Sequence, residues 1–199
     1  MEDDSIVDDV DDLRAFLSIH LELSAEEMAR FTPYVTKVRY EAGETIVAEG
    51  RPCRTVVIAM SGFARAYYVH GDKEVNLRLV RGPAAVVALA SLITGEPSQE
   101  TLQALSPITG YRSRLRDYET DHPGAVADRV RRVLAEQHYL SMDRRLRTLQ
   151  YKTARERYAY FCEHMEPEIV RGVAGYHVAS YLGVTPESLS RVRARVGRS

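Results

Sequence analysis

The sequence has only two cysteines and no long hydrophobic run. Cys53 and Cys162 lie far apart, and neither belongs to a CxxC pair. Two thiolates are too few for a structural zinc site or an iron–sulfur cluster. No apolar run approaches the roughly 20 residues that cross a bilayer, and the acidic residues 1–12 cannot be the basic start of a signal peptide. We therefore expect a cytoplasmic protein without a membrane segment.

The sequence also lacks the patterns of two common ligand sites. Its six histidines include no HxH pair with a following glutamate, so a cupin-like metal enzyme is not expected. Gly62, Gly71 and Gly82 are spaced as turns and not as a phosphate-binding GxGxxG motif. We accordingly predict no catalytic residue, no metal site and no cofactor.

The charges are distributed unevenly along the 199 residues. Residues 123–199 hold 14 Lys and Arg against 8 Asp and Glu, whereas residues 1–122 hold 13 against 20. A basic C-terminal part is suited to face phosphate, and an acidic part avoids it. Two solvated surfaces that happen to differ in charge would give the same counts.

Alternation of apolar and polar residues predicts short β-strands in the first part of the chain. The expected strands lie at 35–40, 55–60, 63–69, 75–79, 101–105 and 108–115. His70-Gly71-Asp72-Lys73 separates two of them and is typical of a hairpin turn. Short strands at regular intervals with glycine turns indicate an antiparallel roll of the jelly-roll type.

A helical period replaces this alternation after residue 124. Five residues recur at spacings of 4, 3, 4 and 3, as in the seam of a coiled coil: Val126, Val130, Val133, Gln137 and Leu140. An amphipathic helix that packs on its own domain fits the same pattern. Further on, Thr153 and Glu156 have the spacing of a capping box and indicate the start of another helix.

Residues 178–193 have the pattern of two short helices joined by a glycine turn. Val178, Ala179 and Leu182 give the first helix an apolar face, and Gly183 can take the positive φ that ends it. Thr185 follows as the expected N-cap of the second helix. Proline at the first helical position and glutamate in the first turn both favour a helix start.

The second of these helices has an inward and an outward face. Leu189, Val192 and Val196 are spaced to face inward. The residues left outward or on the flanks are Pro186, Glu187, Ser190, Arg191 and Arg195. Such a helix fits the major groove of DNA, where arginine can pair with guanine and glutamate can accept from cytosine N4. For contact with phosphate we expect Thr185, Ser188 and His177.

Residues 178–191 resemble the recognition segment of the cyclic-AMP receptor protein and of FNR-like regulators, the CRP/FNR superfamily. Residues 40–46 and 61–65 resemble the opening strands and a glycine corner of its cyclic-nucleotide-binding-like domain. The resemblance implies an α+β fold: a β-roll sensor at 13–120, a dimerisation helix at 121–141 and a winged-type helix-turn-helix domain at 142–199. Since the chain ends soon after Val196, we expect little or no wing.

The same resemblance implies the partners and the residue roles of a bacterial-type regulator. The implied partners are double-stranded DNA with a pseudo-palindromic operator, a second copy of the chain and RNA polymerase. The resemblance also favours the seam of residues 126–140 as the dimer interface. By position, Thr185 and Ser188 correspond to phosphate contacts, and Glu187 and Arg191 to base-reading residues. Pro186 stands where well-known relatives have arginine, so we expect a different target sequence.

The effector segment departs from the pattern of the relatives that bind cyclic AMP. Those relatives carry a Gly-Glu pair for the ribose and an arginine for the cyclic phosphate. Here Val86-Val87 stands in place of the Gly-Glu pair. Gln99 stands in place of the arginine, and Glu100 follows Gln99 directly. Because a buried cyclic phosphate needs a charged partner, we expect neither cyclic AMP nor cyclic GMP to bind.

Three other interpretations fit parts of the sequence. A small molecule that is not a nucleotide could bind the β-roll and control DNA affinity. A cupin-like enzyme could carry a structural helical tail, although no convergent His/Glu set supports it. An adaptor could have a helix-turn-helix that no longer binds DNA, but Arg191 and Arg195 argue against such decay.

Overall fold

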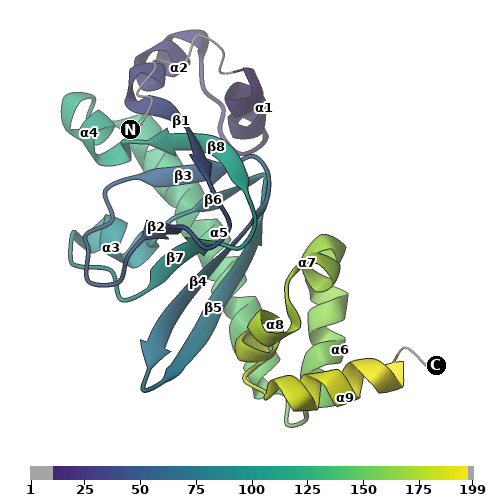
Figure 1. Cartoon of the computed structure of the whole chain (residues 1–199). Coiled ribbons are helices and arrows are strands. Elements are labelled where there is room, and N and C mark those ends of the chain that lie inside the picture. Colours follow the sequence, from purple (N-terminus) through teal and green to yellow (C-terminus); the bar gives the residue numbers. More distant parts are fainter. Residues whose placement is uncertain (1–10, 197–199) are drawn as a thin grey trace.

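The structure, a computed structural model, describes residues 11–196, with side chains to Arg195. It contains a β-roll, a long helix and a group of C-terminal helices (Figure 1), which confirms the predicted α+β fold. The elements of the N-terminal part are α1 (Asp11–His20), α2 (Ala25–Phe31), η1 (Thr32–Tyr34), β1 (Val35–Tyr40), β2 (Thr45–Val47), β3 (Val56–Ala59), β4 (Phe63–His70), β5 (Lys73–Arg81), β6 (Ala84–Val86), α3 (Leu89–Thr94), β7 (Thr101–Ala104), β8 (Ile108–Ser113) and α4 (Leu115–Asp121). The elements that follow are α5 (Ala125–Gln150), α6 (Ala154–His164), α7 (Pro167–Gly172), α8 (Gly175–Leu182) and α9 (Pro186–Val196).

Two four-stranded antiparallel sheets form the β-roll. Their strand orders are β1-β8-β3-β6 and β2-β7-β4-β5. The predicted hairpin is confirmed: β4 pairs with β5 through His70↔Lys73, and Gly71 in the turn has a φ of 63°. The roll therefore has the jelly-roll-like character that the strand pattern predicted.

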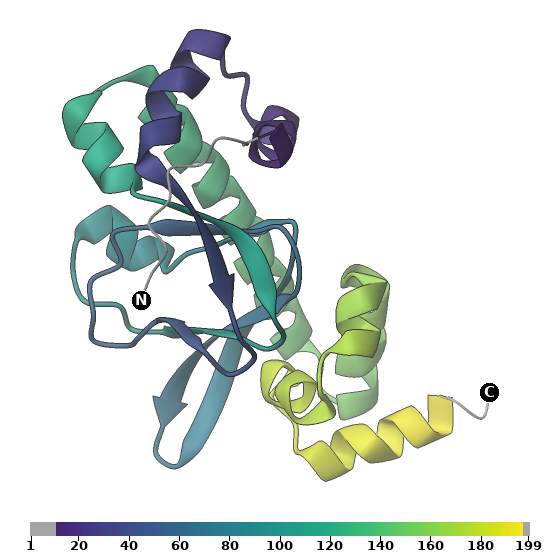
Figure 2. The same cartoon turned by 45° about the horizontal axis from the view of Figure 1, so that its top comes forward.

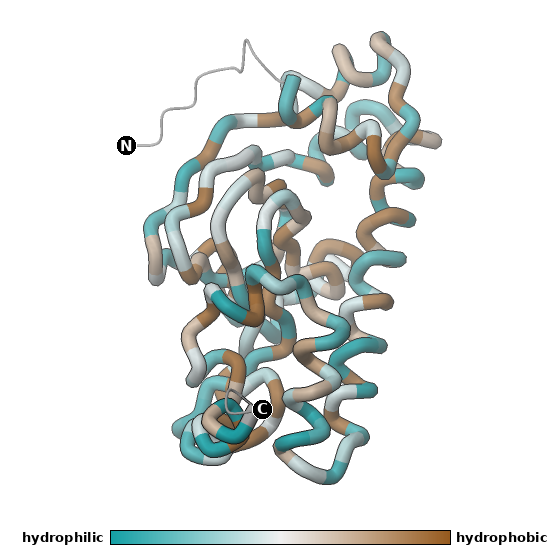
Figure 3. The backbone as a smooth tube through the Cα atoms, turned by 90° about the vertical axis from the view of Figure 1, so that its right-hand side faces the viewer, coloured by the Kyte–Doolittle hydropathy of each residue, from teal (hydrophilic) through white to brown (hydrophobic). Residues whose placement is uncertain are grey.

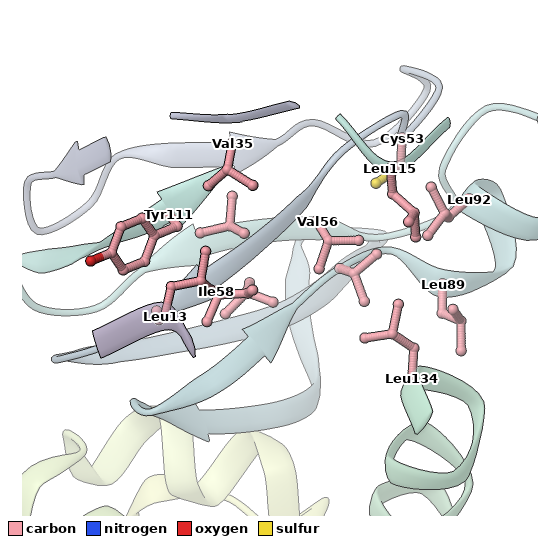
Figure 4. Close-up of a cluster of buried hydrophobic side chains, with 14 of the residues drawn as sticks. Leu13, Val35, Cys53, Val56, Ile58, Leu89, Leu92, Tyr111, Leu115 and Leu134 are labelled. Atoms are coloured by element: carbon pink, nitrogen blue, oxygen red, sulfur yellow. The ribbon is translucent and has the colours of Figure 1, made fainter. Parts of the chain in front are cut away.

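The core of the β-roll lies between these sheets and the helices around them (Figure 4). All four residues of β3 are buried, because neighbouring elements cover both of its faces. Leu13 from α1, Leu92 from α3 and Leu134 from α5 complete the cluster. Each such leucine stabilises the fold by about 1.5–3 kcal/mol relative to an exposed one.

Several short elements were not predicted from the sequence. Strands β2 and β6 have three residues each, too few for a period of two to be recognised. The predicted last strand, 108–115, ends at Ser113, and Leu115 begins helix α4. Helices α3 and α7 have six residues each, less than two helical turns.

Helix α5 runs along one side of the β-roll and continues to the C-terminal helices (Figure 2). Val126 is 9% exposed, and Val130 and Val133 pack beside it on the β-roll core. The structure therefore places the three valines of the predicted dimer seam against the chain's own β-roll. They belong to the intrachain core, which was the other structure that their spacing allowed. The predicted domain boundary at residue 141 falls inside this helix.

Hydrophobic and hydrophilic residues alternate along the whole of α5, including its lower half beside the C-terminal helices (Figure 3). Those helices enclose a second cluster that includes Phe161, Ile169, Leu182 and Leu189. The predicted capping box is present at the start of α6: Thr153 Oγ1 accepts from the N–H of Glu156, whose carboxylate accepts from the N–H of Thr153. The expected short or absent wing concerns residues 197–199, which lie outside the described residues.

No group of three or more His, Cys, Asp and Glu in residues 11–196 is placed to hold a metal ion. No helix of that part of the chain has both the length and the apolar character for a membrane span.

Candidate nucleic-acid interface

The turn between α8 and α9 is built on Gly183. Its φ of 63° lies in the left-handed region, where a side chain would be strained. The N–H of Val184 donates to the carbonyl of Ala179 at 3.0 Å and closes the end of α8. Arg157 of α6 donates from Nη1 to the carbonyls of Leu182 and Gly183 at 3.0 and 3.2 Å. Arg157 therefore fixes the turn, a role that no local pattern indicated.

Helix α9 begins with the predicted cap. Thr185 Oγ1 accepts from the N–H of Ser188 at 3.2 Å, and Pro186 is the first helical residue. The backbone N–H of Glu187 and the Thr185 hydroxyl hold the pKa of the Glu187 carboxyl below its usual value. The start of α9 thus carries an ionised carboxylate where the helix dipole stabilises it.

The two faces of α9 are arranged as the sequence predicted. Leu189 is 2% exposed and Val192 packs against the same cluster, while the side chain of Val196 lies outside the described residues. Arg191 donates from Nη2 to Ser188 Oγ at 3.3 Å. Of the predicted DNA-contact residues, Ser188 is half-buried and the exposed ones are Thr185, Pro186, Glu187, Ser190, Arg191 and Arg195.

A third arginine of α9 has a different place. Arg193 lies over the ring of Tyr158, with Cζ 5.4 Å from the ring centroid. Its Nε and Nη2 are buried and have no hydrogen-bond partner within the described residues. Arg193 therefore packs α9 on α6 and leaves the outward face to Arg191 and Arg195.

His177 is a correction to the predicted interface. The structure places it in α8 at 7% exposure, facing the β-roll. Its Nδ1 accepts from Arg65 Nη1 at 3.2 Å, and its carbonyl accepts from Asn76 Nδ2 at 2.9 Å. In this arrangement His177 is not available to phosphate, because its ring lies between α8 and strands β4 and β5.

Polar contacts around His177 attach the helix-turn-helix unit to the β-roll. The N–H of Asn76 donates to Ser180 Oγ at 2.9 Å, and Ser180 Oγ donates to the carbonyl of Glu74 at 2.8 Å. Glu74 also pairs with the buried Arg65 at 2.6 Å. Leu79 of β5 adds apolar contact with the C-terminal cluster. No local pattern predicts these contacts, because they join residues about a hundred positions apart.

The segment that corresponds to the nucleotide-binding positions of the cyclic-AMP-binding relatives contains an internal ion pair. Arg78 Nη2 lies 2.5 Å from Glu100 Oε1 and donates to the carbonyl of Val87 at 3.0 Å. Arg78 Nη1 lies 3.2 Å from His138 Nδ1 on α5. Burial raises the pKa of the Glu100 carboxyl, and the charge of Arg78 opposes that shift. Val86 and Val87, which replace the Gly-Glu pair, are buried in the core.

The side of α5 that faces away from the β-roll carries an apolar strip. We call it the exposed α5 strip, and its members are the exposed Ala135, Tyr139, Leu146 and Leu149 and the half-buried Met142. Tyr139 is 68% and Leu146 58% exposed. The five positions follow spacings of 4, 3, 4 and 3 and thus lie on one side of the helix. Leu140, from the predicted seam, is 60% exposed and lines a cleft beside the β-roll together with Gln137.

Comparison with known proteins supports the architecture. Residues 37–119 match the family model of the cyclic nucleotide-binding domain. FixK2 from Bradyrhizobium japonicum has a similar structure, with a TM-score of 0.68 and 20% identity over 82% of this chain and 85% of that chain. The c-di-GMP responsive global regulator CLP from Xanthomonas campestris gives 0.67 and 18% over 88% and 92%.

A regulator from Eubacterium rectale, described as a putative transcriptional regulator of the crp/fnr family, gives a TM-score of 0.67 and 14% identity over 87% of this chain and 83% of that chain. No curated protein matches the chain in sequence. At these identities the structural likeness establishes the fold: the β-roll, the long helix and the C-terminal helices occur together in these proteins.

Proposed function

We propose that this chain, which has the fold of the CRP/FNR superfamily and a cyclic nucleotide-binding-type domain, is a transcription regulator that binds double-stranded DNA. The observation that carries the proposal is the outward face of α9. Its inward residues are packed, its start is capped, and its exposed side offers Glu187, Arg191 and Arg195. A rigid helix with this face fits the major groove.

The roles of the exposed residues follow from the chemistry of the groove. Arg191 can donate two hydrogen bonds to guanine O6 and N7, and Glu187 can accept from cytosine N4. Thr185 and Ser188, at the start of α9, are suited to phosphate oxygens, which position the helix without reading sequence. Arg195 is placed to add charge near the backbone. His177 takes part only if α8 leaves the β-roll.

We propose further that the regulator acts as a homodimer through the exposed α5 strip. A second copy presents the same five residues at the same spacing, which is what a two-stranded coiled coil requires. Charged pairs flank the strip at Arg132–Glu136 and Asp143–Arg147, at 2.9 and 2.7 Å. Two recognition helices related by a two-fold axis would read a pseudo-palindromic operator. A contact with RNA polymerase stays a prediction.

The experiment that tests the function is selection of bound sequences from random DNA by the purified full chain. We expect an enriched site with two related half-sites, about 10 base pairs apart from centre to centre or a multiple of that spacing. Arg39→Ala is the matched control, because Arg39 is exposed on β1 and, within residues 11–196, its ion pair is with Glu41 at 2.9 Å. Selection that enriches no sequence with either protein would contradict the proposed function.

A further inference from the structure

A cleft of about 320 Å³ lies between α5, strands β5 and β6, and the start of the C-terminal helices. Its walls include Arg78 and Arg81 from β5, Arg144 from α5, and Glu166 just before α7. The volume is at the lower end of the range of about 300–1,000 Å³ that small-molecule sites occupy. None of the predicted DNA-contact residues lies in this cleft.

Cationic groups from two elements converge on the cleft. Arg78 is 6% exposed, and its buried Nε has no hydrogen-bond partner within the described residues. Among the residues that the structure describes, Arg81 pairs with Glu168 alone, at the long distance of 3.9 Å. Arg144 contacts the sulfur of Met165 at 3.7 Å, and no carboxylate of the described part lies within ion-pair distance of it. Glu166 is the one carboxylate among the lining residues.

Neutral hydrogen-bonding groups lie between these cations. Arg78 Nη1 points to His138 Nδ1, and because a guanidinium can only donate, this nitrogen of the imidazole accepts and the ring is neutral. Burial and the charge of Arg78 lower the pKa of His138 to about 4. The hydroxyl of Ser141 and the amide of Gln137 line the same space.

We propose that this cleft binds a small molecule with at least two negative charges. The unpaired guanidinium of Arg144 and the weakly paired guanidinium of Arg81 would each gain a charge-assisted hydrogen bond from such a ligand. Ser141 and Gln137 would orient it. A neutral ligand would leave the two guanidiniums uncompensated, and a cation would be repelled.

Titration calorimetry of the full chain with inorganic pyrophosphate and with citrate tests the site at constant ionic strength. We expect one molecule of at least one probe per chain with a micromolar dissociation constant. Pyrophosphate binding alone would indicate a phosphorylated ligand, and citrate binding alone a carboxylate. Arg144→Gln and Arg81→Gln should each weaken binding by about tenfold, the effect of one lost charge-assisted bond.

Arg39→Gln is the control on the far side of the β-roll and should bind both probes as the parent does. Arg81→Gln keeps the test decisive if Arg144→Gln folds poorly, since Arg81 is partly exposed. Failure of both probes to bind at millimolar concentration would overturn the proposal. So would equal weakening in Arg39→Gln, because binding would then reflect general charge or the face of α9.

The cleft adjoins the C-terminal helices, and this part of the inference rests on the proposed function. A bound polyanion would compete with Glu168 for Arg81 and so alter the contact between β5 and α7. Saturating pyrophosphate should change operator affinity at least about threefold in the parent and leave it unchanged in Arg144→Gln. If pyrophosphate leaves the operator affinity of the parent unchanged as well, the ligand does not regulate DNA binding. The calorimetry tests ligand binding to the cleft without DNA, so the two outcomes can be distinguished.

Discussion

At the scale of single residues, the three arginines of α9 differ in what they can do. Arg193 is held over the ring of Tyr158, so its charge stabilises packing. Arg191 and Arg195 are exposed, and they lie about one turn apart. Arg191 is nearer the capped start of the helix, the end that enters the groove first in this class of motif. We therefore propose base reading for Arg191 and contact with the DNA backbone for Arg195.

Replacing these two arginines should produce different losses of DNA binding. Arg191→Ala should cost about 1–3 kcal/mol at the selected operator and relax one base position. Arg195→Ala should weaken all sequences more evenly and lower the salt slope by about one. Fluorescence anisotropy at several salt concentrations measures both. Operator binding by Arg191→Ala that equals the parent's would refute the base-reading assignment.

The buried ion pair of Arg78 and Glu100 supports the prediction that cyclic nucleotides do not bind. Arg78, which could have paired with a cyclic phosphate, already contacts Glu100, Val87 and His138. A bound nucleotide would have to displace the Glu100 carboxylate into water or remain beside it, and both cost free energy. We expect no saturable heat from cyclic AMP or cyclic GMP at physiological concentrations, and operator binding without either. A micromolar dissociation constant in calorimetry would contradict this.

At the scale of elements, α5 shows why the dimer seam could not be chosen from the sequence. Mostly apolar residues follow the 4-3-4-3 spacing on two faces of the helix, at 126–140, where Gln137 is the polar member, and at 135–149. Both faces satisfy the coiled-coil pattern. Only the packing of the β-roll distinguishes them: Val126 and Val130 face that core, and Tyr139 and Leu146 face away from it.

Charge substitutions on the two faces of α5 should have different effects. Leu146→Asp should sediment as a folded monomer and lose specific DNA binding, since two half-sites together supply the affinity. Val130→Asp should instead lower the free energy of unfolding by several kcal/mol, because it buries an unpaired charge in the intrachain core. Sedimentation and urea unfolding of both variants measure this. A Leu146→Asp protein that stays dimeric would place the interface elsewhere.

Local signals in the sequence accounted for a large part of the fold and of the candidate site. The hairpin at Gly71, the capping box at Thr153 and the turn at Gly183 depend on neighbouring residues, so they could be predicted. His177 could not, because its surroundings come from Arg65 and Asn76, about a hundred positions earlier. The Arg78–Glu100 pair was missed for the same reason: each residue lies in a different strand or turn, and no spacing rule connects them.

At the scale of the whole molecule, the helix-turn-helix unit is attached to the β-roll by a partly polar contact. Asn76 is fully buried and donates to the carbonyl of His177. Arg145 of α5 is also buried, over the ring of Tyr181 at 4.8 Å. Its Nε and Nη1 have no hydrogen-bond partner among the described residues. Buried cations without such partners cost free energy, so the contact is less stable than an apolar one of equal area.

Protonation of His177 should weaken this contact. Burial, and then the charge of Arg65, lower the pKa of His177 to about 4, against 6.5 for the unperturbed ring, and Glu74 opposes the shift only in part. Between those values the unfolded or detached state binds more protons than the docked state. The stabilisation is therefore complete above about pH 6.5 and is lost as the pH falls toward about 4. His138, whose pKa is also lowered to about 4, adds to the loss.

Urea unfolding at pH 7.5 and pH 5 measures this effect. The lowered pKa of His177 should by itself reduce the unfolding free energy of the parent by about 1–2 kcal/mol from pH 7.5 to pH 5, because the unfolded state binds more protons. His177→Gln keeps a neutral hydrogen-bond acceptor at every pH, so its loss should be smaller by about that amount. His138→Gln is the matched variant, because it removes the other depressed histidine and leaves the contact of α8 with β5 intact. In hydrogen exchange at pH 5, corrected for the intrinsic rate, α8 of the parent should lose more protection than α8 of His177→Gln. Equal pH dependence in the parent and His177→Gln would show that His177 does not titrate with docking.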